Sequence, residues 1–277
     1  MILAILQKKP IDKSAVPVCI EYIHIQECCR NLSIRRILSH WVFSIKVLKV
    51  LLVRKPNVIL GVLPCNSLGL VLWFYKKMHS SVQLIIDVTD MWPESLPISK
   101  FSKKLLCLFL LPWRWLRKMG VSAADKVICE CNLFARMVMK AGLKEYPSVV
   151  YLNSEEKVEY RDVSISGGAL KIAYLGSINH IIDIDGIVNL LKKVKTRGSV
   201  ELHIIDGGIS REHFIKSVQS VGVPVIWHGM IFDKKKRREI LSGCHYWLNI
   251  MKSSVLAGLT NKSIDYTSSG LPLFKYN

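Results

Sequence analysis

Acidic residues are scarce in this sequence of 277 residues. It holds 21 Asp and Glu against 39 Lys and Arg, which leaves a formal net charge of +18 at pH 7. A surplus of this size indicates an anionic partner, such as nucleic acid, an anionic lipid surface or a phosphorylated substrate. Most of the surplus lies in residues 1–150, where 22 basic residues stand against 9 acidic ones; residues 151–277 hold 17 and 12. The sign of the charge does not choose among these partners.

The eight cysteines lack the paired spacing of a zinc site or a disulfide framework. No CxxC unit occurs, and the neighbours Cys28 and Cys29, like Cys129 and Cys131, have no second pair at the spacing that zinc requires. We interpret the cysteines as reduced, buried thiols. We expect no metal and no cofactor.

A signal-peptide pattern and a long apolar run are also missing. The apolar residues 1–6 are followed almost directly by two lysines and a proline, which leaves too short a stretch for a signal peptide. The segment Asn57–Tyr75 is the one to test as a membrane span, but Pro64 and Asn66 divide it into a strand-like and a helix-like part. The sequence therefore predicts a cytoplasmic protein in which Asn57–Tyr75 forms a buried strand and a buried helix.

Half of the residues are apolar, and short β-rich runs alternate with longer amphipathic stretches. This alternation is typical of βαβ units and a parallel sheet. In the first half, the predicted elements are Val18–Ile25, Ile34–Val53, Val58–Leu63, Ser67–Met78, Gln83–Val88, Lys103–Lys118, Lys126–Glu130 and Leu133–Ala141. In the second half, they are Leu170–Leu175, Asp185–Lys195, Val200–Ile205, Ser210–Val221, Pro224–His228, Lys234–Leu241 and Tyr246–Met251.

A polar segment with Gly and Ser separates the two halves. Residues 153–168 have the composition of a linker between domains. The sequence therefore predicts an α/β protein with two Rossmann-like domains, residues 1–152 and 169–277.

Carboxylates follow the predicted strand Gln83–Val88. In doubly wound sheets, ligands bind at the carboxyl ends of the strands. Asp90 and Glu94 are therefore candidate catalytic residues, because a carboxylate at this place can hydrogen-bond or deprotonate an attacking hydroxyl. The same acids fit equally well as caps of the next helix or as acceptors in a turn.

Two further sites suit a phosphorylated ligand. Gly176 and Ser177 follow a strand, where glycine lets the backbone approach a phosphate and the next helix directs amide donors at it. Lys262 and Asp265 are three residues apart, so on a helix they share one face, where the cation can neutralise a diphosphate and the carboxylate can accept ribose hydroxyls. A simple turn and a surface ion pair remain the alternatives.

Three segments together resemble a known family. Asp87–Ser95 is similar to the DxxDxWPES stretch of bacterial family 4 glycosyltransferases, which build capsule, exopolysaccharide and O-antigen. Ala173–Ser177 resembles the YLGS motif that opens their donor domain, and Asn261–Pro272 resembles their NKxxEYxxxGxP segment. The three segments occur in the order of the family, so their combination is far more specific than any one of them.

The resemblance implies a GT-B fold, in which two Rossmann-like domains face each other across a cleft. The first half would bind the acceptor and the second half the nucleotide-sugar, which is a substrate and not a cofactor. The implied activity transfers the sugar to a lipid-linked or polysaccharide acceptor with retention of anomeric configuration. The implied donor contacts are Gly176, Ser177, Gly229, Met230, Lys262 and Asp265.

The family pattern is incomplete in this chain. Many relatives carry two glutamates, of which Asp265 matches the second and Ala257 replaces the first, and their Arg/Lys pair just after Gly176 is missing. Relatives also open with a strand and a glycine-rich loop before anything like Val18–Ile25, and they continue well beyond Pro272. The resemblance therefore implies truncation at both ends, and an inactive remnant of such an enzyme is the alternative function.

Basic residues flank an apolar, Trp-bearing segment at residues 103–118. Such a composition is typical of an element in a membrane interface, where each basic residue contributes on the order of 1 kcal/mol. A core helix with its charged ends in water fits equally well. We expect peripheral attachment at the inner face of the cell membrane. The candidate membrane- or acceptor-facing residues are Lys103, Lys104, Trp113, Arg114, Trp115, Arg117 and Lys118.

The strong positive charge also fits a nucleic-acid-binding α/β protein. No RNA- or DNA-binding motif occurs, and the run Lys234–Arg238 is better interpreted as a solvated helix start. This alternative rests on charge alone, so nucleic acid is the less favoured partner.

Overall fold

The computed structural model describes residues 2–6, 20–24, 34–63, 65–92, 94–95, 100–151, 168–205, 207–253, 255, 270 and 272–274. The chain divides into two compact units, residues 1–151 and 152–277. The sequence predicts the end of the first domain at residue 152. Of the predicted linker, only residue 168 is described.

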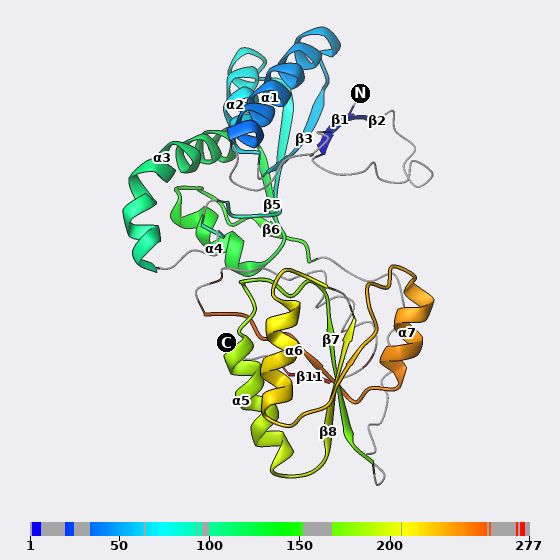
Figure 1. The fold of residues 1–277 in the computed structure, drawn as a ribbon. Coiled ribbons are helices and arrows are strands. Elements are labelled where there is room, and N and C mark those ends of the chain that lie inside the picture. Colours follow the sequence, from blue (N-terminus) through cyan, green and yellow to red (C-terminus); the bar gives the residue numbers. More distant parts are fainter. Residues whose placement is uncertain are drawn as a thin grey trace. The chain divides into compact units, whose positions relative to one another are not determined.

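Unit 1 is built on a six-stranded parallel sheet with the order β2-β1-β3-β4-β5-β6 (Figure 1). The strands are β1 (Ile2–Leu6), β2 (Ile20–His24), β3 (Val58–Leu63), β4 (Gln83–Val88), β5 (Lys126–Cys129) and β6 (Ser148–Val149). The helices are α1 (Ile34–Arg54), α2 (Asn66–Met78), α3 (Lys100–Ala123) and α4 (Asn132–Lys140).

Strand β1 corrects one expectation from the sequence. It lies between β2 and β3, with Ile2 opposite both Ile20 and Val58, so the first strand of the sheet is present and its expected absence is wrong. The run was missed because a short apolar segment has no periodicity that distinguishes a strand from other buried structure. Residues 7–19, where the glycine-rich loop was sought, lie outside the described residues.

Two glycines bring α2 and α3 into close contact. A Cβ added to Gly69 would lie 2.5 Å from the carbonyl oxygen of Leu116, and a Cβ added to Gly120 would lie 2.6 Å from the Cα of Gly69. No larger side chain fits between the two backbones without a shift. This crossing fixes α3 against α2 and so determines where the arginines in the middle of α3 can reach.

Unit 2 is a five-stranded parallel sheet with the order β11-β10-β7-β8-β9. Its strands are β7 (Leu170–Leu175), β8 (Val200–Ile205), β9 (Val225–Trp227), β10 (Tyr246–Leu248) and β11 (Leu273–Phe274). Its helices are α5 (Ile184–Lys195), α6 (Arg211–Ser220) and α7 (Lys234–Ser242).

Helices cover both faces of the unit 2 sheet (Figure 1). Alternate residues of β7 divide between the faces: Ile172 and Tyr174 pack with α5 and α6, whereas Ala173 and Leu175 pack with Leu241 of α7. Helices on both faces of a parallel sheet are the layered arrangement of a doubly wound domain.

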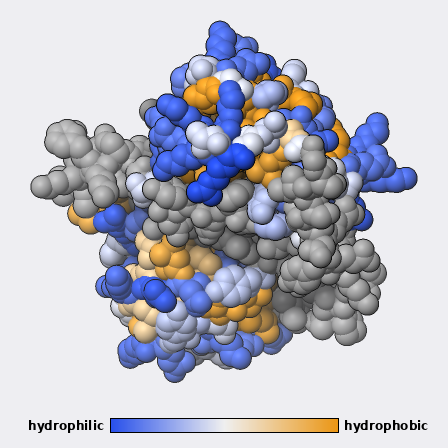
Figure 2. Space-filling model, turned by 90° about the horizontal axis from the view of Figure 1, so that it is seen from below, coloured by the Kyte–Doolittle hydropathy of each residue, from blue (hydrophilic) through white to orange (hydrophobic). Residues whose placement is uncertain are grey.

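The described surface carries hydrophobic side chains in patches that hydrophilic side chains border, as one face of the molecule shows (Figure 2). None of the described helices combines the length and apolar character that a membrane span requires. The segment Asn57–Tyr75 accordingly forms β3 and most of α2.

Candidate functional site

Carboxylates converge at the carboxyl ends of β4 and β5 in unit 1. Burial and the nearby charges of Asp87 and Asp90 raise the pKa of Glu130 to about 6 from an ordinary value of 4.5. Burial also raises the pKa of Asp87. Asp87 lies opposite Ile128 on the paired strand, so Glu130, two residues on, is on the same face of the sheet. Such an environment favours a carboxyl group that can take up a proton near neutral pH.

Glu94, the second predicted catalytic acid, has a different environment. Its two oxygens accept hydrogen bonds from the Arg117 guanidinium at 2.7 and 2.9 Å, and Arg114 Nε lies 3.2 Å away. The forked donor geometry of arginine matches a carboxylate at both oxygens. This arrangement favours a positioning role for Glu94, because both of its oxygens are already engaged.

The carbonyl oxygen of Trp92 is the second anchor of this loop. It accepts hydrogen bonds from Arg117 at 2.8 Å and from the Asn66 side chain at 3.0 Å. The remaining oxygen of Asn66, Oδ1, is buried and has no hydrogen-bond partner among the described residues. The loop after β4 is thereby tied to the start of α2 and to the middle of α3, which holds Asp90 in place.

The predicted membrane-facing set on α3 is therefore divided. Arg117 is only 4% exposed and is bonded to Glu94, so its predicted place at a membrane surface is wrong. Arg114 reaches the same carboxylate, and Trp113 packs edge-on against Trp92. Exposed positions of the set are Trp115, at 56%, and Lys118. The side chains of Lys103 and Lys104 lie outside the described residues.

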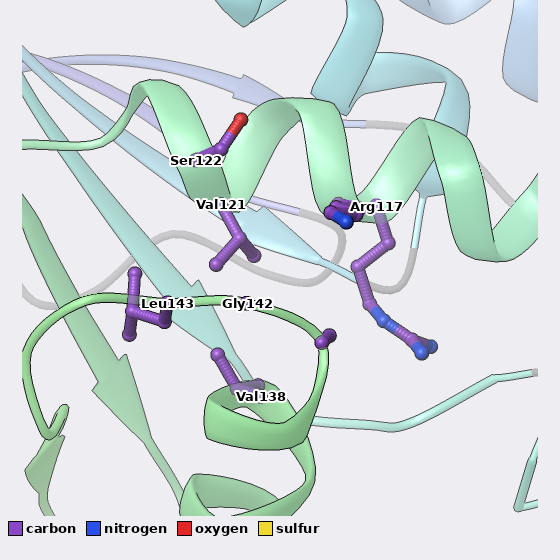
Figure 3. A pocket seen from close by; sticks show the side chains of 8 residues that line it. Arg117, Val121, Ser122, Val138, Gly142 and Leu143 are labelled. Carbon is purple, nitrogen blue, oxygen red and sulfur yellow. The ribbon is translucent and has the colours of Figure 1, made fainter.

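A shallow hollow lies between α3 and the end of α4 (Figure 3). Val121 of α3 and Val138 of α4 face it together with Leu143, whereas the side chains of Ser122 and Arg117 extend away from them (Figure 3). The residues that line it include no carboxylate and no histidine. We therefore interpret this hollow as a packing gap between two helices and not as a catalytic site.

Three loops meet at the carboxyl ends of β7, β8 and β9 in unit 2. The Ile178 N–H donates to the Gly207 carbonyl at 2.8 Å, and the Ser210 N–H donates to the Ile178 carbonyl at 3.1 Å. Gly208 has a φ of +146°, and a Cβ there would lie 2.6 Å from the Ile178 nitrogen. A Cβ on Gly207 would lie 3.7 Å from Cγ of Met230, so the loop after β9 lies alongside the other two.

The structure brings four of the six predicted donor contacts to this edge. Gly176, with a φ of +105°, turns the chain after β7, and Ser177 next to it is exposed. Gly229 has a φ of +78° and Met230 is 64% exposed. Their two backbone N–H groups have no acceptor among the described residues. Lys262 and Asp265, the other two predicted contacts, lie outside the described residues.

Four charged or polar side chains form a line across the strands, from the amino ends of β7 and β8 to the residue that follows β9. Lys171 Nζ on β7 lies 3.6 Å from Glu201 Oε1 on β8, and the same oxygen lies 3.1 Å from His203 Nε2. His203 Nδ1 lies 3.0 Å from Nε2 of His228, which follows β9. The planes of the two imidazoles differ by 17°. Spacing along the sequence gave no signal for this line, which depends on the pairing of the strands.

Comparison with solved structures places most of the chain in one fold class. It is similar to the apo form of the lipopolysaccharide outer core galactosyltransferase WaaB, with 17% identity, a TM-score of 0.60 and coverage of 92% of this chain and 65% of that one. It is also similar to sucrose-phosphate synthase from Thermosynechococcus elongatus, with 13% identity, a TM-score of 0.64 and coverage of 92% and 65%. The protein has the GT-B fold.

Both GT-B halves are covered by these likenesses, because 92% of the chain aligns. The chain spans about two thirds of the length of these structures. A third GT-B likeness, the N-terminal domain of trehalose-6-phosphate phosphatase from Candida albicans, has 14% identity and a TM-score of 0.59, and 92% of this chain covers 69% of it. No family model and no curated protein sequence matches the chain.

The GT-B chain carries functional candidates that sequence reasoning missed. Glu130 follows β5 as Asp90 follows β4, so the rule that ligands bind at the carboxyl ends of strands could have included it. His228 directly precedes the predicted donor contacts Gly229 and Met230, but only strand pairing reveals its contact with His203. The described residues contain no group of three His, Cys, Asp or Glu side chains suited to a metal ion.

Proposed function

We propose that the chain is a glycosyltransferase that takes a sugar from a nucleotide-sugar and transfers it to a lipid-linked or polysaccharide acceptor in the synthesis of a surface polysaccharide. The GT-B fold supports this function. WaaB is a lipopolysaccharide galactosyltransferase, and the pneumococcal O-GlcNAc transferase GtfA, at 13% identity and a TM-score of 0.50, was solved with UDP and GlcNAc.

The loops at the carboxyl edge of unit 2 carry the proposal. The backbones of the loops after β7 and β8 meet at Ile178 and Gly208. In the adjacent loop after β9, Gly229 and Met230 offer backbone N–H donors that have no acceptor among the described residues. Backbone N–H groups that lie close to a helix start suit the phosphates and base of a nucleotide. We assign the donor to this edge, with Lys262 and Asp265 as the charged contacts to its diphosphate and ribose.

The acceptor is assigned to the carboxylates of unit 1. Asp90 and Glu130 lie where an attacking hydroxyl can be hydrogen-bonded, and the raised pKa of Glu130 suits proton uptake near neutral pH. Glu94 holds the loop through Arg117. We propose retention of anomeric configuration through a transition state with oxocarbenium character.

Binding of the donor is tested by thermal shift with UDP-, GDP- and dTDP-sugars, because a ligand that binds only the folded state raises the melting temperature. We expect one nucleotide class to raise it. The variant Lys262→Ala should reduce the shift, whereas the control Lys252→Ala, an exposed lysine of the same unit, should leave it unchanged. A folded protein whose melting temperature responds to none of these sugars contradicts the function. A bound donor without turnover supports the inactive remnant.

The outer face of α1 supports a place at an anionic membrane surface. Its buried side packs Phe43, Val47 and Leu51 into the core, yet the opposite side is also apolar. The exposed apolar residues on it are Leu38 at 58%, Val42 at 52%, Ile45 at 51%, Leu52 at 42% and Val53 at 78%. A helix that is apolar all round is buried by a partner or by lipid.

Charge indicates which partner covers this face. Residues 28–86 contain nine Lys and Arg and no Asp or Glu, and the exposed Lys46 and Lys49 lie on α1 itself. Exposed apolar side chains interspersed with lysines suit the interface of an anionic bilayer. We therefore place the membrane contact on α1, with the exposed Trp115 of α3 as a further contact.

Vesicle flotation tests this surface. The protein should float with vesicles that contain phosphatidylglycerol and not with pure phosphatidylcholine. The charge reversals Lys46→Glu and Lys49→Glu together should lower the bound fraction at least fivefold, given about 1 kcal/mol for each basic residue at such a surface. The control pair Lys192→Glu and Lys193→Glu on α5 changes the net charge equally, so an equal loss with both pairs contradicts a specific surface on α1.

A further inference from the structure

When both rings are neutral, the line of side chains from Glu201 to His228 fixes which nitrogen of each imidazole carries the proton. The hydrogen bond from His203 is the main cause that lowers the pKa of Glu201, with burial acting against it and Lys171 adding to the effect. Glu201 is therefore an ionised carboxylate at neutral pH, and an ionised carboxylate only accepts hydrogen bonds. His203 must donate from Nε2.

The next step follows from the two nitrogens of a neutral imidazole. When Nε2 of His203 is the donor, its Nδ1 carries a lone pair and accepts. His228 Nε2, which lies 3.0 Å from that Nδ1 with the two rings nearly coplanar, must then donate. One proton remains for each ring, so His228 Nδ1 is left with a lone pair and no proton.

The residue that carries this lone pair lies at the proposed donor edge, directly after β9. His228 directly precedes Gly229 and Met230, whose backbone N–H groups have no acceptor among the described residues, and it is only partly buried. His203 behind it is 9% exposed. The site thus combines backbone donors with one side-chain acceptor of fixed orientation and the exposed apolar side chain of Met230, a set that matches the polar edge and flat face of a nucleobase.

We propose that His228 reads the nucleobase of the donor by accepting, at Nδ1, the ring N–H of uracil, thymine or guanine. His203 and Glu201 are positioning residues that keep His228 in the tautomer with this lone pair. The inference rests on the proposed function, and it selects among nucleotides: the Watson–Crick edges of cytosine and adenine carry a ring nitrogen without hydrogen at this position, so two lone pairs would face each other.

Binding of nucleoside diphosphates to the full chain tests the proposal. We expect UDP, dTDP or GDP to bind at least tenfold more tightly than CDP and ADP, since a site built around a hydrogen bond rejects a ligand that cannot make it. His228→Ala should weaken the preferred nucleotide about tenfold, the value of one good hydrogen bond. The control His213→Ala removes an exposed histidine on α6 and should change nothing.

Methylated nucleotides separate the hydrogen bond from general packing. N3-methyluridine diphosphate or N1-methylguanosine diphosphate lacks the ring proton, and we expect it to bind the wild type at least tenfold more weakly than its parent. In His228→Ala this penalty should largely vanish, because the acceptor is already gone. An equal penalty in both proteins overturns the role of His228 while leaving the proposed function intact. No binding of any nucleoside diphosphate to the wild type overturns both.

Nuclear magnetic resonance detects the tautomer of His228 directly. A histidine with a purely structural role would not be required to hold this tautomer. In the wild type, 15N correlation spectra at neutral pH should show His228 protonated at Nε2 and unprotonated at Nδ1. His203→Phe removes the acceptor for the Nε2–H of His228 and should produce a mixture of the two His228 tautomers. The affinity for the nucleotide should then fall severalfold. A wild-type spectrum with the proton on Nδ1 overturns the proposal.

Discussion

Arg117 holds Glu94 in a two-pronged ion pair, with nitrogen–oxygen distances of 2.7 and 2.9 Å, inside unit 1. The arginine is 4% exposed, and it also donates to the carbonyl oxygen of Trp92 at 2.8 Å. One side chain from the middle of α3 therefore fixes both the backbone and the carboxylate of the loop that carries Asp90. In the proposed mechanism Asp90 relies on this support, and Arg117 itself touches no substrate.

Removal of Arg117 is the first prediction. Arg117→Ala leaves the Glu94 carboxylate and the Trp92 carbonyl without their donor, and we expect the free energy of unfolding of unit 1 to fall by about 3 kcal/mol. Urea unfolding followed by circular dichroism measures the change. Arg136→Ala, at an exposed position of α4, is the matched control and should stay within about 0.5 kcal/mol of the wild type.

A double-mutant cycle with Glu94→Ala tests the pairing itself. If the two side chains act as one unit, the double variant is little worse than Arg117→Ala alone, with a coupling of about 1–3 kcal/mol. Strictly additive losses would show that the ion pair seen between the two residues contributes nothing.

The crossing of α2 and α3 gives the second prediction. Gly120→Ala places a Cβ against the backbone of Gly69, so the helices must separate, and we expect a loss of about 1–3 kcal/mol as for other overpacked sites. Gly198→Ala is the control, because nothing lies within 4 Å of the added Cβ and the position is exposed. Thermal unfolding of both variants should separate them clearly; equal melting temperatures would contradict the close crossing.

The third prediction concerns pH. The pKa of Glu130 is raised from 4.5 to about 6 in the folded protein, so between these values the folded state binds more protons than the unfolded state. Stability must therefore fall as pH rises from about 4.5 to about 6, and the full penalty persists above that. Glu130→Gln removes the charge and should be more stable than the wild type at pH 7.5, with an advantage that shrinks toward pH 4.5.

Urea titrations of wild type and Glu130→Gln at several pH values measure this difference. Glu145→Gln alters an exposed carboxylate and should give a difference that does not change with pH. A constant difference for Glu130→Gln would contradict the raised pKa and weaken its assignment to proton uptake.

Thiol reactivity gives the fourth prediction. Burial is the main cause that raises the pKa of Cys129 to about 12 and that of Cys244 to about 11, and both side chains are almost fully buried. The thiolate is the reactive form, so neither should react with iodoacetamide in the native protein at pH 7.5. Peptide mass mapping should find both alkylated only after unfolding in urea; rapid native labelling of either one contradicts its burial.

Periodicity alone predicted most elements because the signal is local. The strands β3, β4, β7 and β8 occupy the residues that the alternation indicated, and the predicted helix ends coincide with the observed ones or differ from them by at most five residues. The largest difference is at α3, which begins at Lys100 and ends at Ala123. Its flanking residues lack a clear apolar period, and Gly120, beyond the predicted end, lies against Gly69 of α2.

Three strands were not predicted from the sequence, and all three are short. β1, β6 and β11 are five or two residues long, and a short segment acquires its strand conformation from the neighbours it pairs with. β1 lies between two other strands, so the sheet stabilises a segment whose own sequence is not decisive.

By itself, the sequence determined the alternation of strands and helices and the break between two α/β halves, and it indicated the strand ends at which ligands are expected, because each of these depends on residue type and on spacing along the chain. Only the tertiary structure decided which side chains meet there: Glu94 with Arg117, Glu130 with the field of Asp87 and Asp90, and His228 with His203. These pairs join residues on different elements, and their contact is set by strand register and helix crossing, which arise from packing across the whole unit.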